Sequence, residues 1–169
     1  MPPHKKAAKP APSTVKIHID GAARGNPGPA GVGIVISGRK PVEMGLSIGE
    51  ATNNVAETVA LIIALQEALK RGEKRVLVCT DSELLANQVA GLYKVKDKQL
   101  QWLHAIIRSL TGGFDSFDIR HVPRAENRQA DRLAGKAVID GLREHSRDRK
   151  RKTIQPDSSQ AGIQQPTFW

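Results

Sequence analysis

Four acidic residues are the strongest candidates for chemistry in this sequence. They are Asp20, Glu57, Asp81 and Asp131, and each stands where a predicted strand ends or a predicted helix begins. Carboxylates held close together raise each other's pKa unless a cation neutralises them, and hard oxygen ligands favour Mg²⁺ or Mn²⁺. If the fold gathers these side chains, they predict a divalent-metal site.

Each acid also has an ordinary structural explanation. Asp20 can form an Asx turn, and Asp81 can cap the helix that follows it. Glu57 fits a capping box in which Asn54 caps the helix, and Asp131 fits an exposed helix position. The joint pattern therefore carries the argument, and no single acid does.

Hydrophobic periodicity predicts the elements that would position these acids. Apolar residues alternate from Val15 to Ile19, which predicts a strand before Asp20, and the Gly/Pro-rich turn GAARGNPGPAG follows. Strands at 33–37 and 41–48 would complete an antiparallel meander. The remaining predicted elements are a helix at 52–71, a buried strand at 75–80, helices at 82–91 and 99–110, a fifth strand at 117–121 and a last helix at about 125–142.

This order predicts one α/β domain, and we consider a sheet in which the first strand lies beside the fourth. The ends of those two strands would then bring Asp20 and Asp81 together. The length of 169 residues fits a single domain, which we place at 15–143, between a flexible basic arm at 1–14 and a flexible basic tail at 144–169. The net charge of +9 suits a protein that meets phosphate, although ribosomal and chromatin proteins share it.

Several other classes fit poorly. Cys79 is the only cysteine and falls in a predicted buried strand, which argues against a disulfide and against thiol catalysis. The glycine-rich turn precedes a strand and not a helix, so no nucleotide cofactor is indicated. Without an apolar run of membrane-spanning length or an apolar signal segment, we expect no membrane association and a cytoplasmic location, with the nucleus or an organelle as alternatives in a eukaryote. We also expect a monomer.

Four motifs in order resemble one family. The segments DGAARGNPGPAG, TNNVAE (52–57), TDS (80–82) and AENRQAD (125–131) resemble type 1 ribonuclease H over roughly 15–143. The resemblance implies a ribonuclease H-like five-stranded mixed sheet, its first three strands antiparallel, flanked by helices. It also implies a metal-dependent endonuclease that hydrolyses the RNA strand of RNA/DNA hybrids.

The resemblance further implies a role for each acid. Asp20 would bridge two Mg²⁺ ions, with Mn²⁺ able to substitute, and Asp131 would complete the site that holds the attacking water. Glu57 and Asp81 would hold the ion beside the leaving oxygen, giving 5′-phosphate and 3′-hydroxyl ends. His121 matches a loop histidine thought to assist proton movement in relatives. A plain histidine at a strand end is the open alternative, because the loop HVPRAEN lacks the glycine-rich character of the bacterial prototype.

Hybrid recognition would depend on the 2′-hydroxyls of the RNA strand. The candidate contacts are Gly21, Arg24, Asn26, Asn53, Asn54 and Asn127. Arg24, Arg124 and Arg128 are candidates for phosphate contacts, with an ordinary solvated surface position as the alternative for each. For Asn26 the alternative is a plain turn.

The sequence departs from the family prototype in one segment. The extra basic helix and loop of the prototype are replaced by GLYKVKDKQ (91–99), where Lys94, Lys96 and Lys98 would substitute in part. The tail HSRDRKRK (145–152) would attract phosphate or act as a nuclear-import signal. The terminal QPTFW resembles peptides that dock on sliding clamps, and packing onto its own domain is the alternative.

Two rival functions stay open. A hybrid-binding module can keep this fold without cleavage, although the complete set of four acids argues against it. A nuclease acting on double-stranded RNA or DNA can also share the fold.

Overall fold

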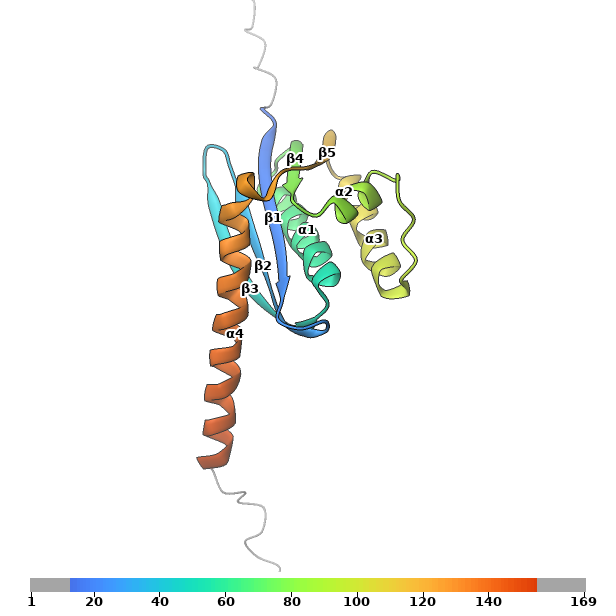
Figure 1. The fold of residues 1–169 in the computed structure, drawn as a ribbon. Coiled ribbons are helices and arrows are strands. Elements are labelled where there is room, and N and C mark those ends of the chain that lie inside the picture. The colour runs from blue at the N-terminus through green and yellow to red at the C-terminus, as the bar shows by residue number, and fades with distance from the viewer. Residues whose placement is uncertain (1–12, 155–169) are drawn as a thin grey trace, which may run out of the picture.

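The structure, a computed structural model, describes residues 13–154. Its elements in chain order (Figure 1) are β1 (Val15–Ala23), β2 (Gly28–Ile36), β3 (Val42–Ala51), α1 (Asn53–Lys70), β4 (Arg75–Thr80), α2 (Glu83–Val89), α3 (Lys98–Thr111), β5 (Ser116–His121), the short 3₁₀ helix η1 (Arg124–Glu126) and α4 (Arg128–Ile154). Within this part of the chain, no helix is long and apolar enough to cross a membrane.

The strands form one mixed sheet in the order β3-β2-β1-β4-β5. β1, β2 and β3 pair antiparallel, whereas β4 pairs parallel with both β1 and β5. This confirms the predicted five-stranded mixed sheet with three antiparallel strands first. It also shows that β1 lies beside β4.

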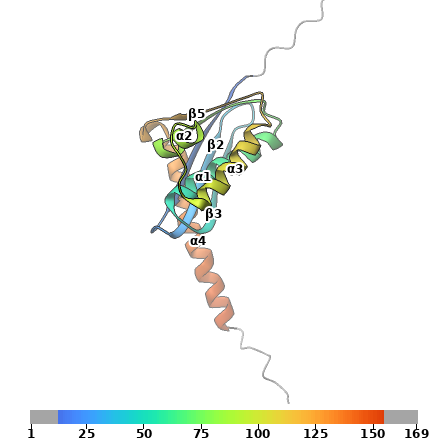
Figure 2. The same cartoon turned by 90° about the vertical axis from the view of Figure 1, so that its right-hand side faces the viewer.

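Helices cover both faces of the sheet. Asp20 pairs with Gly33, so both point to the face on which α4 lies, because Gly33 meets Ala130 and Ala134 of α4. The next residue of β1, Gly21, meets α1 on the opposite face. There α3 packs against α1 (Figure 2).

The main core fills the space between the sheet and α1. Ile17 and Ile19 of β1, Ile34 of β2, and Leu61 and Leu65 of α1 are fully buried. Burying apolar side chains of this size is the main force that fixes α1 on the sheet. α1 therefore presents its N-terminal turns at a fixed place beside the end of β1.

The strands extend further into the glycine-rich segment than predicted. β1 continues to Ala23 and β2 begins at Gly28, leaving a four-residue turn. Gly25 has a φ of +110°, and a Cβ at Gly28 would overlap the carbonyl of Arg24. Turn glycines and strand glycines look alike in the sequence, which is why the pattern predicted a longer turn.

The cap of α1 also differs from the prediction. Thr52, and not Asn54, is the N-cap, and its hydroxyl accepts from the amide N of Val55 at 3.3 Å. Threonine is a good N-cap, so the helix begins as soon as Thr52 supplies the acceptor. The capping box considered as the alternative explanation of Glu57 is therefore wrong, and its carboxylate is available to other partners.

The last helix runs beyond its predicted end. α4 continues to Ile154 instead of stopping near Leu142, so the flexible tail expected from residue 144 is wrong for 144–154. The segment 143–154 lacks glycine and proline and is rich in arginine and lysine, which are good helix formers, but it has no apolar period to signal a helix. Residues 1–12 of the arm predicted at 1–14, and the terminal QPTFW, lie outside the described residues.

Candidate active site

Asp20 and Asp81 occupy equivalent places on neighbouring strands. The parallel pairing of β1 and β4 ends at His18 and Cys79, and each acid stands two residues further on. Asp20 is 8% exposed. The end of one strand pair therefore holds two acids side by side, as the sequence predicted.

The electrostatics of Asp20 show that all four acids belong to one site. Burial, and then the charges of Asp81, Asp131 and Glu57 in that order, together raise the pKa of Asp20 to about 7, against an opposing backbone hydrogen bond from Gly21. A buried carboxyl surrounded by three others is costly to ionise in the absence of a cation. The other three acids thus lie near enough for their charges to act on Asp20.

Glu57 can lie close to Asp20 because Gly21, the residue after Asp20, has no side chain. A Cβ at Gly21 would overlap the backbone of Ala56 and Glu57, so only glycine lets α1 approach β1 this closely. Gly21 is buried beneath α1, and its predicted contact with the hybrid is wrong. A glycine after an aspartate looks like a turn in the sequence, and nothing in the pattern marks a close helix–strand contact.

Two hydrogen bonds fix the Glu57 carboxylate. Ser82 Oγ donates to Oε2 at 2.6 Å, and Asn53 Nδ2 donates to Oε1 at 2.8 Å. Burial raises the pKa of Glu57 and the charge of Asp81 adds to this, while both hydrogen bonds oppose it. Ser82 also caps α2 by accepting from the amide N of Leu85 at 3.3 Å, so the capping role considered for Asp81 belongs to Ser82.

Asn127 holds the Asp81 side chain in place by a hydrogen bond. Its Nδ2 donates to Asp81 Oδ1 at 3.0 Å and to the carbonyl of Ile19 at 2.9 Å, and His18 Nδ1 lies 3.3 Å from its Oδ1. Asn127 is 0% exposed, so its predicted contact with the hybrid is wrong. The AENRQAD motif marked the residue, but only the fold shows that it ties β1, the end of β4 and the start of α4 together.

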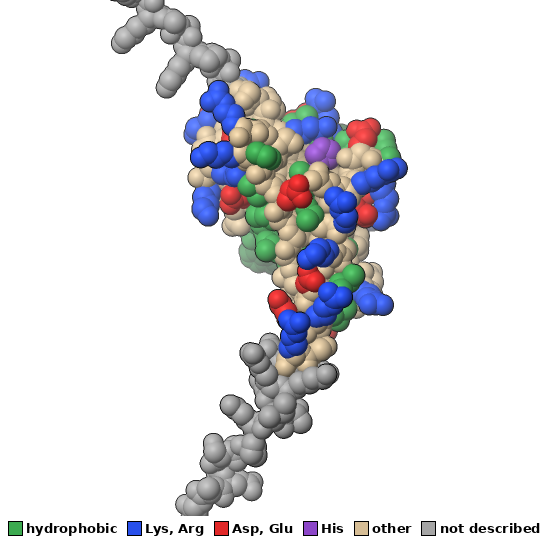
Figure 3. Space-filling view, turned by 90° about the vertical axis from the view of Figure 1, so that its left-hand side faces the viewer, with side chains coloured by type: hydrophobic (Ala, Val, Ile, Leu, Met, Phe, Trp, Pro, Cys, Tyr) green, Lys and Arg blue, Asp and Glu red, His purple; other side chains and the backbone are tan. Residues whose placement is uncertain are grey.

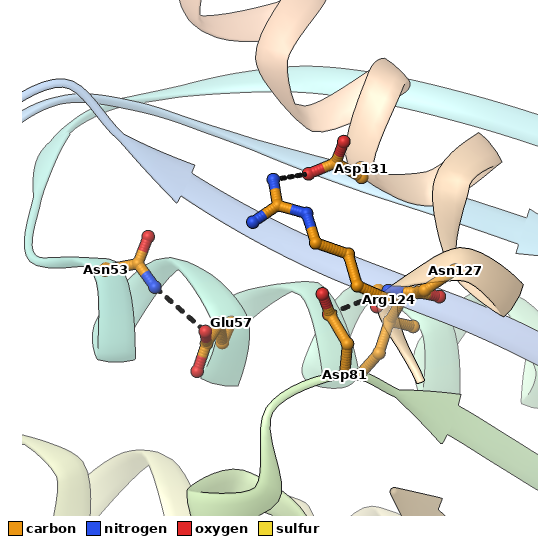
Figure 4. A network of polar contacts seen from close by, with 7 residues as sticks. Asn53, Glu57, Asp81, Arg124, Asn127 and Asp131 are labelled. Atoms are coloured by element: carbon orange, nitrogen blue, oxygen red, sulfur yellow. Dashed lines mark hydrogen bonds and ion pairs between the residues drawn. The ribbon is translucent and has the colours of Figure 1, made fainter. Parts of the chain in front are cut away.

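Asp131 is held in another way. It lies in the first turn of α4, and its Oδ1 forms an ion pair with Arg124 Nη2 at 2.6 Å. The two side chains are 36% and 75% exposed, and Figure 4 shows the Arg124 side chain extending from η1 across β1 to reach Asp131. Arg124, considered for phosphate contact, therefore supplies positive charge directly to the acidic site.

The donor set fits a hard divalent cation. The four side chains offer carboxylate oxygens alone, the ligands that Mg²⁺ and Mn²⁺ prefer. The raised pKa of Asp20 reflects its burial first and then the negative charge of the other three acids, and Arg124 places a cation against Asp131. Among the described residues, no three acidic, histidine or cysteine side chains already converge as a ligand set, and Oδ1 of Asp131 is paired with Arg124.

His121 lies at the margin of this site. It is the last residue of β5 and pairs with Thr80, next to Asp81, and its side chain is exposed. This placement is compatible with both alternatives, a strand-end histidine and a proton carrier. Its catalytic role stays a prediction.

The predicted hybrid contacts that are exposed border the acids along the N-terminus of α1. Asn26 Oδ1 accepts from the backbone N of Asn53 at 3.2 Å, which ties the β1–β2 turn to α1. Asn54 lines an open groove together with Tyr93, Lys94 and Lys96. Arg24 is exposed in the same turn as Asn26, and Lys98 is exposed at the start of α3.

Comparisons with known proteins agree with this arrangement. The family model described as reverse transcriptase-like matches residues 18–137. Ribonuclease HI of Halobacterium salinarum is 44% identical over 129 residues, covering 75% of this chain and 65% of that protein, so the chain spans about two thirds of that relative. A ribonuclease H of Paramagnetospirillum magneticum is 31% identical over 147 residues, covering 78% of this chain and 94% of that protein.

Two solved structures share the fold of this chain. The crystal structure of RNase H1 from Halobacterium salinarum has a TM-score of 0.72 at 43% identity, covering 76% of this chain and 99% of that one. LC11-RNase H1 in complex with RNA/DNA hybrid also has a TM-score of 0.72, at 39% identity, covering 76% of this chain and 99% of that one. Sheet order and site together thus define a ribonuclease H-like domain.

The chain belongs to the type 1 ribonuclease H family. A single short segment, 90–97, joins α2 to α3. The extra basic helix of the family prototype is therefore absent between these two helices, as the sequence predicted.

Proposed function

We propose that the chain is a metal-dependent endonuclease that hydrolyses the RNA strand of RNA/DNA hybrids. The observation that carries this proposal is the gathering of Asp20, Glu57, Asp81 and Asp131 into one charge-coupled site. Family membership supports it, as does the likeness to LC11-RNase H1, whose structure holds an RNA/DNA hybrid.

The four carboxylates would hold two Mg²⁺ ions, with Mn²⁺ able to substitute. Such ions lower the pKa of an attacking water and offset the charge that develops on the leaving 3′ oxygen. Cleavage of this kind leaves 5′-phosphate and 3′-hydroxyl ends. Asp20, the most central and most buried acid, would serve both ions.

The chain's own contribution is to hold the acids in place. Asn127 orients Asp81, while Ser82 and Asn53 orient Glu57. These donors are neutral, so they position the carboxylates without cancelling their charge. Preorganised ligands of this kind need little rearrangement when the substrate arrives.

Hybrid recognition would use exposed amides beside the acids. Asn26, Asn53 and Asn54 offer both donors and acceptors to the 2′-hydroxyls of the RNA strand. We also propose a monomer in the cytoplasm, on the sequence grounds given above. Gel filtration and cell fractionation test these two points.

The test is cleavage of a labelled RNA/DNA hybrid beside matched double-stranded RNA and double-stranded DNA, with Mg²⁺, with Mn²⁺ and with a chelator. An Asp81→Asn protein purified in parallel controls for contaminating host nuclease. We expect cleavage of the hybrid alone, dependent on metal and absent in Asp81→Asn, with 5′-phosphate and 3′-hydroxyl ends. Tight hybrid binding without cleavage would favour the binding module, and cleavage of double-stranded RNA or DNA would favour a different nuclease.

A further inference from the structure

A hollow lies where the extended part of α4 passes the β1–β2 turn. Its lining consists of Arg24 from the turn and Ile139, Leu142, Arg143, Ser146 and Arg147 from α4. Among these described residues three are arginines and none is acidic. We call Arg24, Arg143 and Arg147 the turn–helix arginine cluster, and all three side chains are exposed.

The cluster retains most of its positive charge. Asp140 Oδ1 lies 3.7 Å from Arg143 Nη1, but Asp140 also accepts from Lys136 at 2.6 Å. One carboxylate is thus shared by two cations, and the Arg143 side chain stays 71% exposed. Figure 3 shows lysine and arginine side chains gathered toward the lower end of the described molecule on this face, with acidic side chains among them.

The cluster lies on a path that leads from the acids. Arg24 shares the β1–β2 turn with Asn26, Asn26 binds the backbone of Asn53, and Asn53 donates to the catalytic candidate Glu57. The turn therefore joins the proposed hybrid contacts at one end to the arginine hollow at the other.

The spacing suits a duplex. At about 1.5 Å per helical residue, Arg143 lies about 18 Å and Arg147 about 24 Å along α4 from Asp131. With a rise of about 3.4 Å along the duplex axis per base pair, this corresponds to roughly 5–7 base pairs. A duplex with its cleaved phosphate at the acids would bring a flanking backbone to the arginines if it follows the turn.

We propose that the turn–helix arginine cluster binds the phosphate backbone of the hybrid about 5–7 base pairs to one side of the cut. Arginine suits this role because its guanidinium can form paired hydrogen bonds to phosphate oxygens. The choice of the hybrid as ligand rests on the proposed function. The positive charge of the turn–helix arginine cluster does not depend on it.

The experiment compares two hybrids, of about 8 and about 24 base pairs, with three proteins besides the wild type. Arg143→Gln/Arg147→Gln removes two charges from the cluster, and Arg24→Gln removes one without altering α4. Arg39→Gln/Lys40→Gln removes two exposed charges at the β2–β3 turn, the opposite end of the molecule, and is the matched control (Figure 1). Hybrid binding is measured by fluorescence anisotropy in a chelator, and KM and kcat are measured with Mg²⁺.

We expect the α4 double variant to bind the long hybrid about tenfold more weakly, with a rise in KM and little change in kcat. Each lost phosphate contact should flatten the salt dependence by about 0.9 in logarithmic slope. From about 50 to about 200 mM salt, wild-type affinity should therefore fall about tenfold more than that of the double variant. Arg24→Gln should produce about half of this slope change, and the preference for the long hybrid should shrink in both proteins.

An equal loss in the Arg39→Gln/Lys40→Gln control would overturn the proposal in favour of a net-charge effect, and so would an unchanged length preference in both cluster variants. If the wild type binds the long hybrid through the cluster but never cleaves it, the proposed function fails while the cluster is confirmed. If the wild type cleaves the hybrid and the cluster variants bind both lengths normally, the cluster fails while the proposed function stands.

Discussion

The two sides of the acidic site are built differently. On one side, Glu57 and Asp81 are fixed by neutral donors, of which Asn127 is fully buried and Ser82 is partly buried. On the other side, Asp131 is held by the exposed guanidinium of Arg124. A buried hydrogen-bond network resists rearrangement, whereas an exposed ion pair contributes little and exchanges readily.

This difference suggests a division of labour. The fixed side keeps two carboxylates ready in one geometry, while the mobile side can release Asp131 when a better cation arrives. Asp20 interacts with the acids of both sides, and its raised pKa shows that its ionised form is unfavourable while no cation is bound. Substitutions on each side should therefore have unlike consequences for stability and for metal dependence.

Asn127→Ala should have the largest effect, because it breaks the fixed side. The change leaves a cavity and removes the donor to the Ile19 carbonyl and to Asp81, which should destabilise the protein by about 2–4 kcal/mol. Cleavage should fall as well, since Asp81 loses its orientation. Urea unfolding at constant pH measures the stability.

Asn54→Ala is the control for that experiment, because it shortens an exposed asparagine near the same site. Its free energy of unfolding should stay within about 0.5 kcal/mol of wild type. If Asn127→Ala changed the free energy of unfolding as little as Asn54→Ala, the buried network would not be what holds the site together.

Asp20→Asn tests the electrostatic cost at the centre. The folded pKa of Asp20 is raised from 3.8 to about 7, so ionisation opposes folding and stability should decline as the pH rises from about 4 through 7. Asn carries no charge, so the variant should lack this decline. At pH 8 without metal it should be more stable than wild type by roughly 1–3 kcal/mol, while losing cleavage.

Thermal unfolding across pH, with and without Mg²⁺, measures this effect. Mg²⁺ should stabilise the wild type more than Asp20→Asn, because the ion neutralises the charge that the variant lacks. Parallel pH profiles for the two proteins in a chelator would contradict the cost assigned to Asp20.

Much of the fold could be predicted from the hydrophobic periodicity of the sequence and from the order of its motifs. The alternation before Asp20 and the buried run at 75–80 predicted two strands, and the register of β1 and β4 shows that these strands are neighbours and that their acids meet. Strand-end acids are visible to sequence reasoning because the chain direction fixes where a strand ends.

The errors share a physical cause. Gly21 and Asn127 act through tertiary contacts with segments 36 and more than 100 residues away, which no local pattern reveals. The extension of α4 was missed for the opposite reason, since helix propensity without an apolar face leaves no periodic signal. Motifs therefore marked the right residues more reliably than they assigned what each residue does.

Arg124→Gln should have the smallest effect on stability and sharpens the contrast between the two sides. The exposed pair contributes about 0–1 kcal/mol, so unfolding should hardly change. Arg124 nevertheless competes with a cation for Asp131, and removing a competitor worth about 0.5–1 kcal/mol should lower the half-saturating Mg²⁺ concentration about two- to fivefold. Arg132→Gln, which removes an exposed charge from the same helix, should shift it less. Mg²⁺ titrations of cleavage decide the point, because an identical shift in both variants would mean that general charge, and not the ion pair with Asp131, controls metal binding.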